Sequence, residues 1–425
     1  MNADAISIVF LVVVFVLGTV LPINIGSLAF AATFLLALIA GLPATDVAAA
    51  FPSNLFSLLV GITYMFAIAQ NNGTMQLITN SALRLVRGNV AVIPWAFHVI
   101  AILLSGIGAG PAASTAILAP IAMSVASRSK INPLLMGVML VHGSHGGSLF
   151  PISPIALIVN GAAAKAGLPD VSIPLFFNGL GMNILIAIAA YLTLGGIGLI
   201  RRAGQGETAE LEVKAEPGLA ADPQGATWIQ VVTLVGILAL LVLGIGFKLD
   251  IGLTAFVIGV ILALLAPAQE KKAVDRIAWP VVLMVAGILT YIGVMQKVGG
   301  MALIGKALAA GGSSQVSIML VAAVGAVTSL FSATGAVLGA TVPLLAHTLG
   351  TAPAVGTVAG AVSTLAIASS VVDSSPMSLQ GAVIMGSAQG IERNVMFRQL
   401  LLWGVVMVFV GTLVPWLLFV ILGIP

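Results

Sequence analysis

Two stretches of the chain place glycines, serines, prolines and ionisable side chains in otherwise apolar sequence. Residues 141–161 read VHGSHGGSLFPISPIALIVNG, and residues 363–382 read STLAIASSVVDSSPMSLQGA. Asp373 is the only acid well inside a predicted span, and an intramembrane carboxylate is by default a cation ligand or proton carrier. His142 and His145 lie three residues apart on one helix face. They could relay protons or bind substrate, and a purely anchoring role fits equally well.

The small residues of these stretches predict an anion site built from helix ends. Ser153-Pro154 and Ser375-Pro376 each resemble an N-cap followed by proline at the first helical position. Helix N-termini offer free N–H groups and a positive dipole end, so they hold a carboxylate without Lys or Arg. The predicted substrate-binding residues are Ala113, Ser114, Thr115, Ser148, Ser153, Ser332, Thr334, Gly335, Ser374, Ser375 and Ser378.

A small coupling cation would need free backbone carbonyls, which glycines make accessible. The predicted residues for it are Gly108, Gly110, Gly146, Gly147, Ser370 and Asp373, with Na⁺ or H⁺ as the ion and no other metal or cofactor. Any single Ser or Gly also fits ordinary helix packing. The set favours a site because it recurs in both halves of the chain.

The composition indicates the class of protein that must position these residues. The 425 residues are 60% hydrophobic and 7% charged, with a mean hydropathy of +1.19, which is typical of a polytopic membrane protein. Cysteine is absent, which excludes disulfides and thiolate chemistry. The polar loops contain no phosphate-binding loop or HExxH motif, so ATP drive within this chain is not expected.

The apolar runs predict an all-α polytopic membrane protein of about ten spans and two re-entrant helical hairpins. Irregular backbone at membrane depth is tolerated only where it is buried in protein or lines a cavity. We expect a first repeat (1–202) with scaffold helices 5–71, interfacial helix 71–88, hairpin 93–127, broken helix 132–164 and helix 173–200. A cytoplasmic linker (203–226) follows. The second repeat (227–425) has scaffold helices 227–296, interfacial helix 297–312, hairpin 314–348, broken helix 354–388 and helix 398–424.

A nearly constant offset relates the two halves. Gly26 pairs with Gly252 and Gly61 with Gly287, both at a shift of 226 residues. The shift falls to 222 where Ser153-Pro154 pairs with Ser375-Pro376. Because five spans is an odd number, the halves must have opposite orientations, as in the inverted repeats of secondary transporters.

Basic residues predict the orientation of the chain in the membrane. The loops near 84–92, 128–131, 201–226, 268–277 and 389–398 carry twelve of the sixteen Lys and Arg residues. The positive-inside rule places these loops in the cytoplasm and both termini outside it, in a bacterial-type inner (plasma) membrane. The first hairpin then enters from the cytoplasm and the second from outside.

These features resemble the ion transporter superfamily and, within it, the malonate and dicarboxylate carrier (MatC) family. The segments GPAASTAILAPIA (110–122) and SATGAVLGATVPLL (332–345) are similar to the hairpin frames of the related divalent-anion:sodium symporters. Their Ser-Asn-Thr signature is replaced here, and the broken helices lack their asparagine. The resemblance implies a homodimer with a fixed scaffold and an elevator-like mobile domain, and it leaves the coupling ion open.

The sequence therefore predicts a secondary active transporter that imports a small dicarboxylate, malonate or a C4 acid such as succinate, with Na⁺ or H⁺. An exchanger or carrier for another small anion is the alternative, followed by a passive anion channel. Enzymatic activity is not expected: a serine hydrolase would need a nucleophile beside a base, and one acid cannot form an aspartyl protease pair. We expect membrane lipid and the anion as partners, and no nucleic acid.

Overall fold

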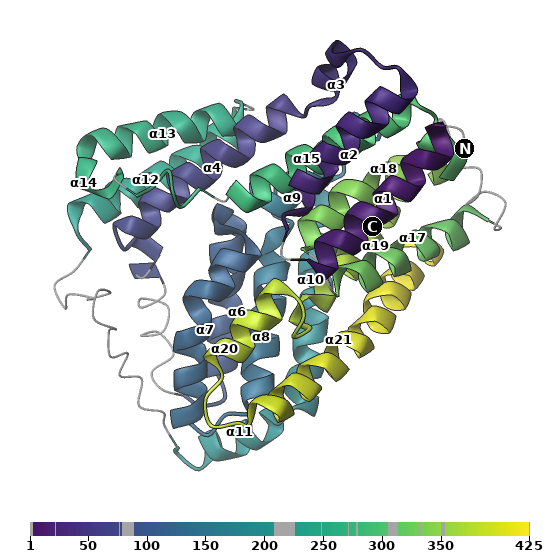
Figure 1. Ribbon diagram of the computed structural model, residues 1–425. Coiled ribbons are helices and arrows are strands. Elements are labelled where there is room, and N and C mark those ends of the chain that lie inside the picture. Colours follow the sequence, from purple (N-terminus) through teal and green to yellow (C-terminus); the bar gives the residue numbers. More distant parts are fainter. Residues whose placement is uncertain are drawn as a thin grey trace.

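The described residues of the computed structural model form helices and no β-strand, which confirms the predicted all-α class for them (Figure 1). They are residues 3–21, 23–75, 77–78, 89–207, 226–247, 249–270, 272–277, 279–304, 313–330, 333–349 and 353–424. Most of the predicted linker 203–226 and large parts of the predicted interfacial helices 71–88 and 297–312 lie outside the described residues, as does Ser332.

The helices follow the apolar runs closely. The first half contains α1 (Ala3–Val20), α2 (Ile25–Ala40), α3 (Ala44–Ala50), α4 (Ser53–Asn71), α6 (Ile93–Leu104), the π-helix η1 (Ser105–Ala109), α7 (Gly110–Arg128), α8 (Pro133–Ser148), α9 (Pro154–Lys165), α10 (Ser172–Thr193) and α11 (Gly196–Gly204). The second half contains α12 (Trp228–Leu241), η2 (Val242–Gly246), α13 (Ile251–Leu265), α14 (Pro267–Glu270), α15 (Trp279–Lys297), α17 (Ser314–Ser329), α18 (Thr334–Leu349), α19 (Val355–Val371), η3 (Val372–Ser374), α20 (Leu379–Ser387), α21 (Arg393–Pro415) and η4 (Trp416–Ile421).

Two helix boundaries differ from the prediction. The helix expected over 173–200 ends at Thr193, because Gly195 adopts a left-handed φ of 115° and the short amphipathic helix α11 starts after it. The helix expected over 398–424 begins earlier, at Arg393. Hydropathy alone does not detect such ends, because the chain stays apolar through the turn at Gly195 while α21 begins with the polar residues Arg393 and Asn394.

Six helical segments of the described chain are long and apolar enough to cross a membrane. One of them, Ile93–Arg128, is not straight, because it is interrupted at Gly108. Further apolar helices of 10–17 residues include Ile25–Ala40 and Ile251–Leu265. The chain is therefore a multi-pass membrane protein.

Close glycine crossings join the two halves. A Cβ atom added to Gly61 of α4 would lie 2.2 Å from the carbonyl oxygen of Gly252 in α13. A Cβ atom added to Gly287 of α15 would lie 2.1 Å from the carbonyl oxygen of Gly26 in α2. Glycine lets these helix backbones touch, as small residues do in membrane helix pairs. Figure 1 shows α4, α12 and α13 together at one edge of the molecule, with α2 beside α15.

Helices α6 and α7 form a hairpin against α8. Ile102 of α6 lies beside Gly147, and His98 Nδ1 is 2.8 Å from the carbonyl oxygen of Met139, so α6 and α8 run in the same direction. A short turn connects α7 to α8, which run in opposite directions. The hairpin turns at Gly108, whose φ of 117° requires glycine.

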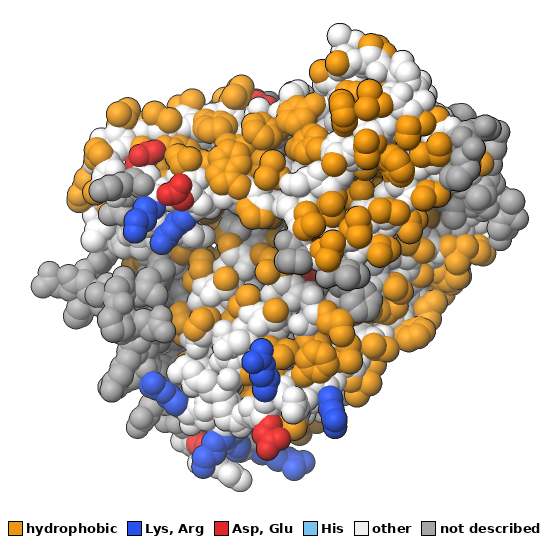
Figure 2. All heavy atoms as spheres, viewed as in Figure 1, with side chains coloured by type: hydrophobic (Ala, Val, Ile, Leu, Met, Phe, Trp, Pro, Cys, Tyr) orange, Lys and Arg blue, Asp and Glu red, His pale blue; other side chains and the backbone are white. Residues whose placement is uncertain are grey.

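The visible surface separates basic from apolar regions. Figure 2 shows Lys and Arg side chains gathered at the end of the molecule where α11 lies and beside α14, while most of the remaining face is hydrophobic. Several chain segments meet at the α11 end: Arg202 donates to the carbonyl oxygens of Ser129 and Lys130, and Gly390 lies next to Ser127. The apolar face is suited to lipid.

We expect Gly252→Ala to lower the free energy of unfolding by about 1–3 kcal/mol, the usual cost of overpacking. The new Cβ atom would lie 2.5 Å from the Cα atom of Leu58, so the two helices must separate. Thermal unfolding in detergent measures the change. Gly181→Ala in α10 is the matched control, because no atom lies within 4 Å of its Cβ position. Equal melting temperatures for both variants would contradict a tight α4–α13 crossing.

Candidate functional site

Both predicted broken helices are interrupted in the structure. Helix α8 ends at Ser148, residues 149–153 form turns, and α9 begins with Ser153 at the N-cap position and Pro154 in its first turn. The Ser153 hydroxyl makes no capping bond. In the second half, α19 continues into the 3₁₀ turn η3, which contains Asp373.

The predicted N-cap at Ser375-Pro376 is wrong. Pro376 lies in a turn, and α20 begins at Leu379 with Ser378 as its N-cap. The Ser378 hydroxyl accepts from the N–H of Gly381 at 3.2 Å and donates to the carbonyl oxygens of Asp373 and Ser375. Ser378 therefore connects the break to the next helix, because its one hydroxyl satisfies backbone groups on both sides.

Asp373 is the centre of a buried polar cluster. Its Oδ2 atom accepts a hydrogen bond from Thr334 Oγ1 at 2.7 Å and lies 3.2 Å from His145 Nε2. Thr334 is the first residue of α18, so its hydroxyl joins the second hairpin to the break. Residues from α8, η3 and α18 thus meet at one carboxylate oxygen.

Gln380 of α20 completes this cluster. Its Nε2 atom lies 2.7 Å from His145 Nε2 and 3.5 Å from Asp373 Oδ2. Its Oε1 atom accepts hydrogen bonds from Thr115 Oγ1 at 2.7 Å and Ser144 Oγ at 2.8 Å. One amide therefore links α20 to both α7 and α8. Sequence reasoning missed Gln380, and its only signal was a lone amide in an apolar run.

Several buried polar atoms of this region have no hydrogen-bond partner within the described chain. They include Asp373 Oδ1, His145 Nδ1, Ser369 Oγ and Ser153 Oγ. A buried polar atom without a partner carries a desolvation cost of about 1–3 kcal/mol. Such atoms are available to a bound ion or substrate. His145 lies on α8, Ser369 on α19 and Asp373 in η3, which follows α19.

His142 and His145 contact different neighbours although they share a helix. The Nδ1 atom of His142 lies 3.0 Å from Asn183 Oδ1, and its Nε2 atom accepts from the indole of Trp403 at 3.2 Å. Both ring nitrogens of His142 are thus occupied by α10 and α21. These two hydrogen bonds hold His142 between α10 and α21, whereas His145 contacts the carboxylate of Asp373.

The remaining predicted site residues occupy three kinds of position. Ser114, Ser148, Ser370 and Ser374 each donate to a carbonyl oxygen three residues earlier in the chain. Gly146 and Gly147 lie where α8 crosses α6, and a Cβ atom on Gly147 would lie 2.1 Å from the carbonyl oxygen of Ile102. Ala113 is half-buried in the first turns of α7.

The start of α9 lies between the two hairpins. A Cβ atom on Gly110, at the start of α7, would lie 3.4 Å from the ring of Pro154. A Cβ atom on Gly335, at the start of α18, would lie 3.4 Å from the side chain of Ile155. The N-terminal ends of α7, α9 and α18 therefore converge, and none of them carries a basic side chain.

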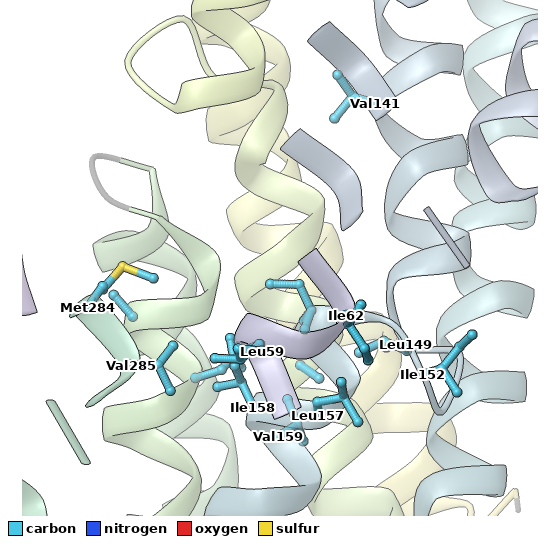
Figure 3. Packing of buried hydrophobic residues seen from close by; sticks show 14 of the residues in the cluster. Leu59, Ile62, Val141, Leu149, Ile152, Leu157, Ile158, Val159, Met284 and Val285 are labelled. Carbon is cyan, nitrogen blue, oxygen red and sulfur yellow. The ribbon is translucent and has the colours of Figure 1, made fainter. Parts of the chain in front are cut away.

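Apolar side chains lie between the start of α9 and the helices α4 and α15. Figure 3 shows Leu59 and Ile62 of α4 beside Ile158 and Val159 of α9, with Met284 and Val285 of α15 on another side. Phe66 of α4 packs where a Cβ atom on Gly108 would stand, 2.4 Å from its ring. The hairpin turn thus rests on a hydrophobic surface with few directional contacts.

We expect Gln380→Met to lower the free energy of unfolding by about 1–3 kcal/mol, because Thr115 loses its buried acceptor and Asp373 loses a donor. Methionine has a similar shape, so packing is retained. Chemical denaturation in detergent measures the loss. The exposed Gln315 supplies the control Gln315→Met, which should change stability little. Equal stability of the two variants would contradict the structural role of the amide.

Comparison with known proteins agrees with this architecture. The crystal structure of the Alcanivorax borkumensis YdaH transporter superposes with a TM-score of 0.59 over 90% of this chain and 88% of that chain. Its 14% sequence identity shows similarity of fold alone. Comparison with curated proteins yields no match. Residues 1–148 match the family model described as "Dicarboxylate carrier protein MatC N-terminus", which confirms the predicted family resemblance for this part of the chain.

Proposed function

We propose that the protein is a secondary active transporter that imports a small dicarboxylate, malonate or a C4 acid, by symport with Na⁺ or H⁺. The observation that carries this proposal is the buried cluster at Asp373, to which α7, α8, α18 and α20 each contribute a side chain. A buried acid between hairpins and broken helices has the position of a coupling-ion site. The carrier named in the matched family supports the substrate class.

The converging helix ends support an anionic substrate. The stretches 93–127, 132–164, 314–348 and 354–388 contain no Lys or Arg. Backbone N–H groups at the starts of α7, α9 and α18 can still stabilise two carboxylates. Ser153 Oγ, which is buried and has no partner in the described chain, is a further donor for the substrate.

Two inverted repeats form the architecture that we propose. Each half contributes one glycine to each of two crossings, Gly26 with Gly287 and Gly61 with Gly252. These four residues form two pairs at the same offset, 26 to 252 and 61 to 287. Likewise α7 packs on α20, and α18 packs on α9. This exchange of partners is expected when two halves are related by a two-fold axis in the membrane plane.

Within this proposal the hairpins are re-entrant and move with the broken helices against α2, α4, α13 and α15. The contacts of α9 with α4 and α15 suit such an elevator-like movement, because apolar side chains make them (Figure 3). The hydrogen bond from Lys165 at the end of α9 to the carbonyl oxygen of Ala50 would break during the movement. A homodimer joined through these four helices would hold them fixed while the hairpins and broken helices move. The basic end of the molecule would face the cytoplasm and leave both termini outside.

Purified protein in liposomes should accumulate labelled malonate or succinate against its gradient when an inward Na⁺ or pH gradient is imposed. Dissipating the gradient should release the label, because a symporter is reversible. A panel of mono- and dicarboxylates measures selectivity, and empty liposomes are the control. Uptake that only equilibrates would indicate a channel, and uptake that needs internal anion would indicate an exchanger.

Asp373→Asn should abolish uphill uptake while preserving the fold. Asparagine is nearly isosteric and can still accept from Thr334, but it can neither neutralise a cation nor bind a proton. Uptake under each gradient measures coupling, and thermal unfolding measures stability. Glu270→Gln, an acid outside the cluster, is the matched control. Wild-type accumulation by Asp373→Asn would remove this residue from the site.

A further inference from the structure

We propose that the coupling ion is a proton held between His145 and Asp373, and that the Gln380 amide transmits its presence to the first hairpin. This inference rests on the proposed symport and names its ion and its positioning residue. It starts from two contacts of one atom, His145 Nε2. That atom lies 3.2 Å from Asp373 Oδ2 and 2.7 Å from Gln380 Nε2.

The two contacts require opposite protonation of His145 Nε2. A carboxylate oxygen and a ring nitrogen at this distance attract only when a proton lies between them, since both otherwise present lone pairs. An amide NH₂ group donates only, so its contact with the same nitrogen requires that nitrogen to be unprotonated. The neutral imidazole with its hydrogen on Nδ1 fits the amide contact, and binding of one proton at Nε2 converts it into the arrangement that fits the carboxylate contact.

Gln380 can satisfy both arrangements by exchanging the ends of its amide, which have nearly the same shape. Without the proton, its NH₂ group donates to His145 and Asp373, and its oxygen accepts from Thr115 and Ser144. With the proton on His145 Nε2, the reversed amide presents its oxygen to Nε2 and accepts a hydrogen bond from that N–H. Its NH₂ group then donates to the hydroxyls of Thr115 and Ser144, and Ser144 already donates to the carbonyl oxygen of Val141.

The reversal of the Gln380 amide affects the substrate region through Thr115. Thr115 lies on α7, in the second turn after Gly110, where the hairpin meets α9. Proton binding changes Thr115 from a donor to an acceptor, so the hydroxyl must rotate. Its free hydrogen can then face the substrate or the neighbouring helix end. Proton and substrate would thereby favour the same arrangement, which is the definition of coupling between sites.

The groups around the Oδ2 atom of Asp373 suit a proton better than Na⁺. Hard cations take oxygen ligands, whereas Asp373 Oδ2 is surrounded by a hydroxyl donor, an amide nitrogen and a ring nitrogen. Nearby titratable groups are His142, held by Asn183 and Trp403, and His98, held by Met139.

The other charges on the elements packed around the pair lie at helix ends. Lys165 at the end of α9 bonds to the carbonyl oxygen of Ala50. Arg393 and Arg398 of α21 are exposed and precede Gly404, where that helix packs on Ser375. Arg128 ends α7. Within the described chain, the helices α6 to α10 and α17 to α20 contain no other Lys, Arg, Asp or Glu apart from Asp373 in η3. Lys130 and Asp170 lie in the turns that connect α7 to α8 and α9 to α10.

The test uses proteoliposomes that contain a pH-sensitive dye. Adding malonate or succinate outside should acidify the lumen in the wild type, and an inward pH gradient alone should drive accumulation. Asp373→Asn and His145→Gln should lose both effects but retain exchange of labelled for unlabelled substrate. Exchange shows that these variants are folded and bind substrate. Glu270→Gln should acidify like the wild type.

Gln380→Met tests the transmission step. In the wild type, the substrate concentration for half-maximal exchange should rise with pH by up to about tenfold per unit, the limit for one linked proton. Gln380→Met should retain exchange with a nearly flat dependence, and Gln315→Met should retain the wild-type slope. A purely structural Gln380 would instead lower activity equally at every pH, and that result would overturn its assigned role.

The outcomes separate this inference from the proposed function. Accumulation driven by Na⁺ without lumen acidification would overturn the proton site and leave symport intact. Substrate-dependent acidification that persists in both Asp373→Asn and His145→Gln would also overturn it. Absence of uphill uptake by the wild type under either gradient would overturn the proposed symport itself.

Discussion

The structure depends on satisfying polar groups where the membrane supplies no water. Helix breaks after Ser148 and Val371 release backbone groups that a straight helix would bond internally. Accordingly, residues 149–153 and 372–376 are buried or half-buried within the protein. At the second break Ser378 bonds backbone on both sides, and Thr334 and Gln380 donate to Asp373. The cost of burying a carboxylate explains why four elements contribute side chains to one place.

Backbone contact between helices supplies the rigid part of the molecule. The crossings at Gly61 and Gly26 bring α4 and α2 against partners from the other half of the chain. In a membrane, association relies on close packing more than on the hydrophobic effect, so these contacts are strong determinants of the fold. The contact between α9 and the scaffold consists instead of aliphatic side chains.

Polar contacts reappear at the margin of that apolar interface. Lys165 at the end of α9 donates to the carbonyl oxygen of Ala50 at 3.0 Å, and Lys297 pairs with Asp46 at 2.9 Å. Both contacts are made to α3, one to the carbonyl oxygen of Ala50 and the other to the carboxylate of Asp46. The ion pair between Lys297 and Asp46 is partly exposed and contributes at most about 1 kcal/mol to stability.

The sequence alone determined the membrane class, most helix positions, the breaks and the position of Asp373 inside an apolar segment, because hydropathy and the placement of charges are local properties. It also indicated the glycines at positions 26, 61, 252 and 287 through their offset. It could not assign Gln380, distinguish His145 from His142, or place the second N-cap at Ser378 instead of Ser375. Those features depend on which side chains from distant segments meet. Only tertiary packing decides that, because hydrogen bonds between α7, α8, α18 and α20 have no counterpart in local sequence.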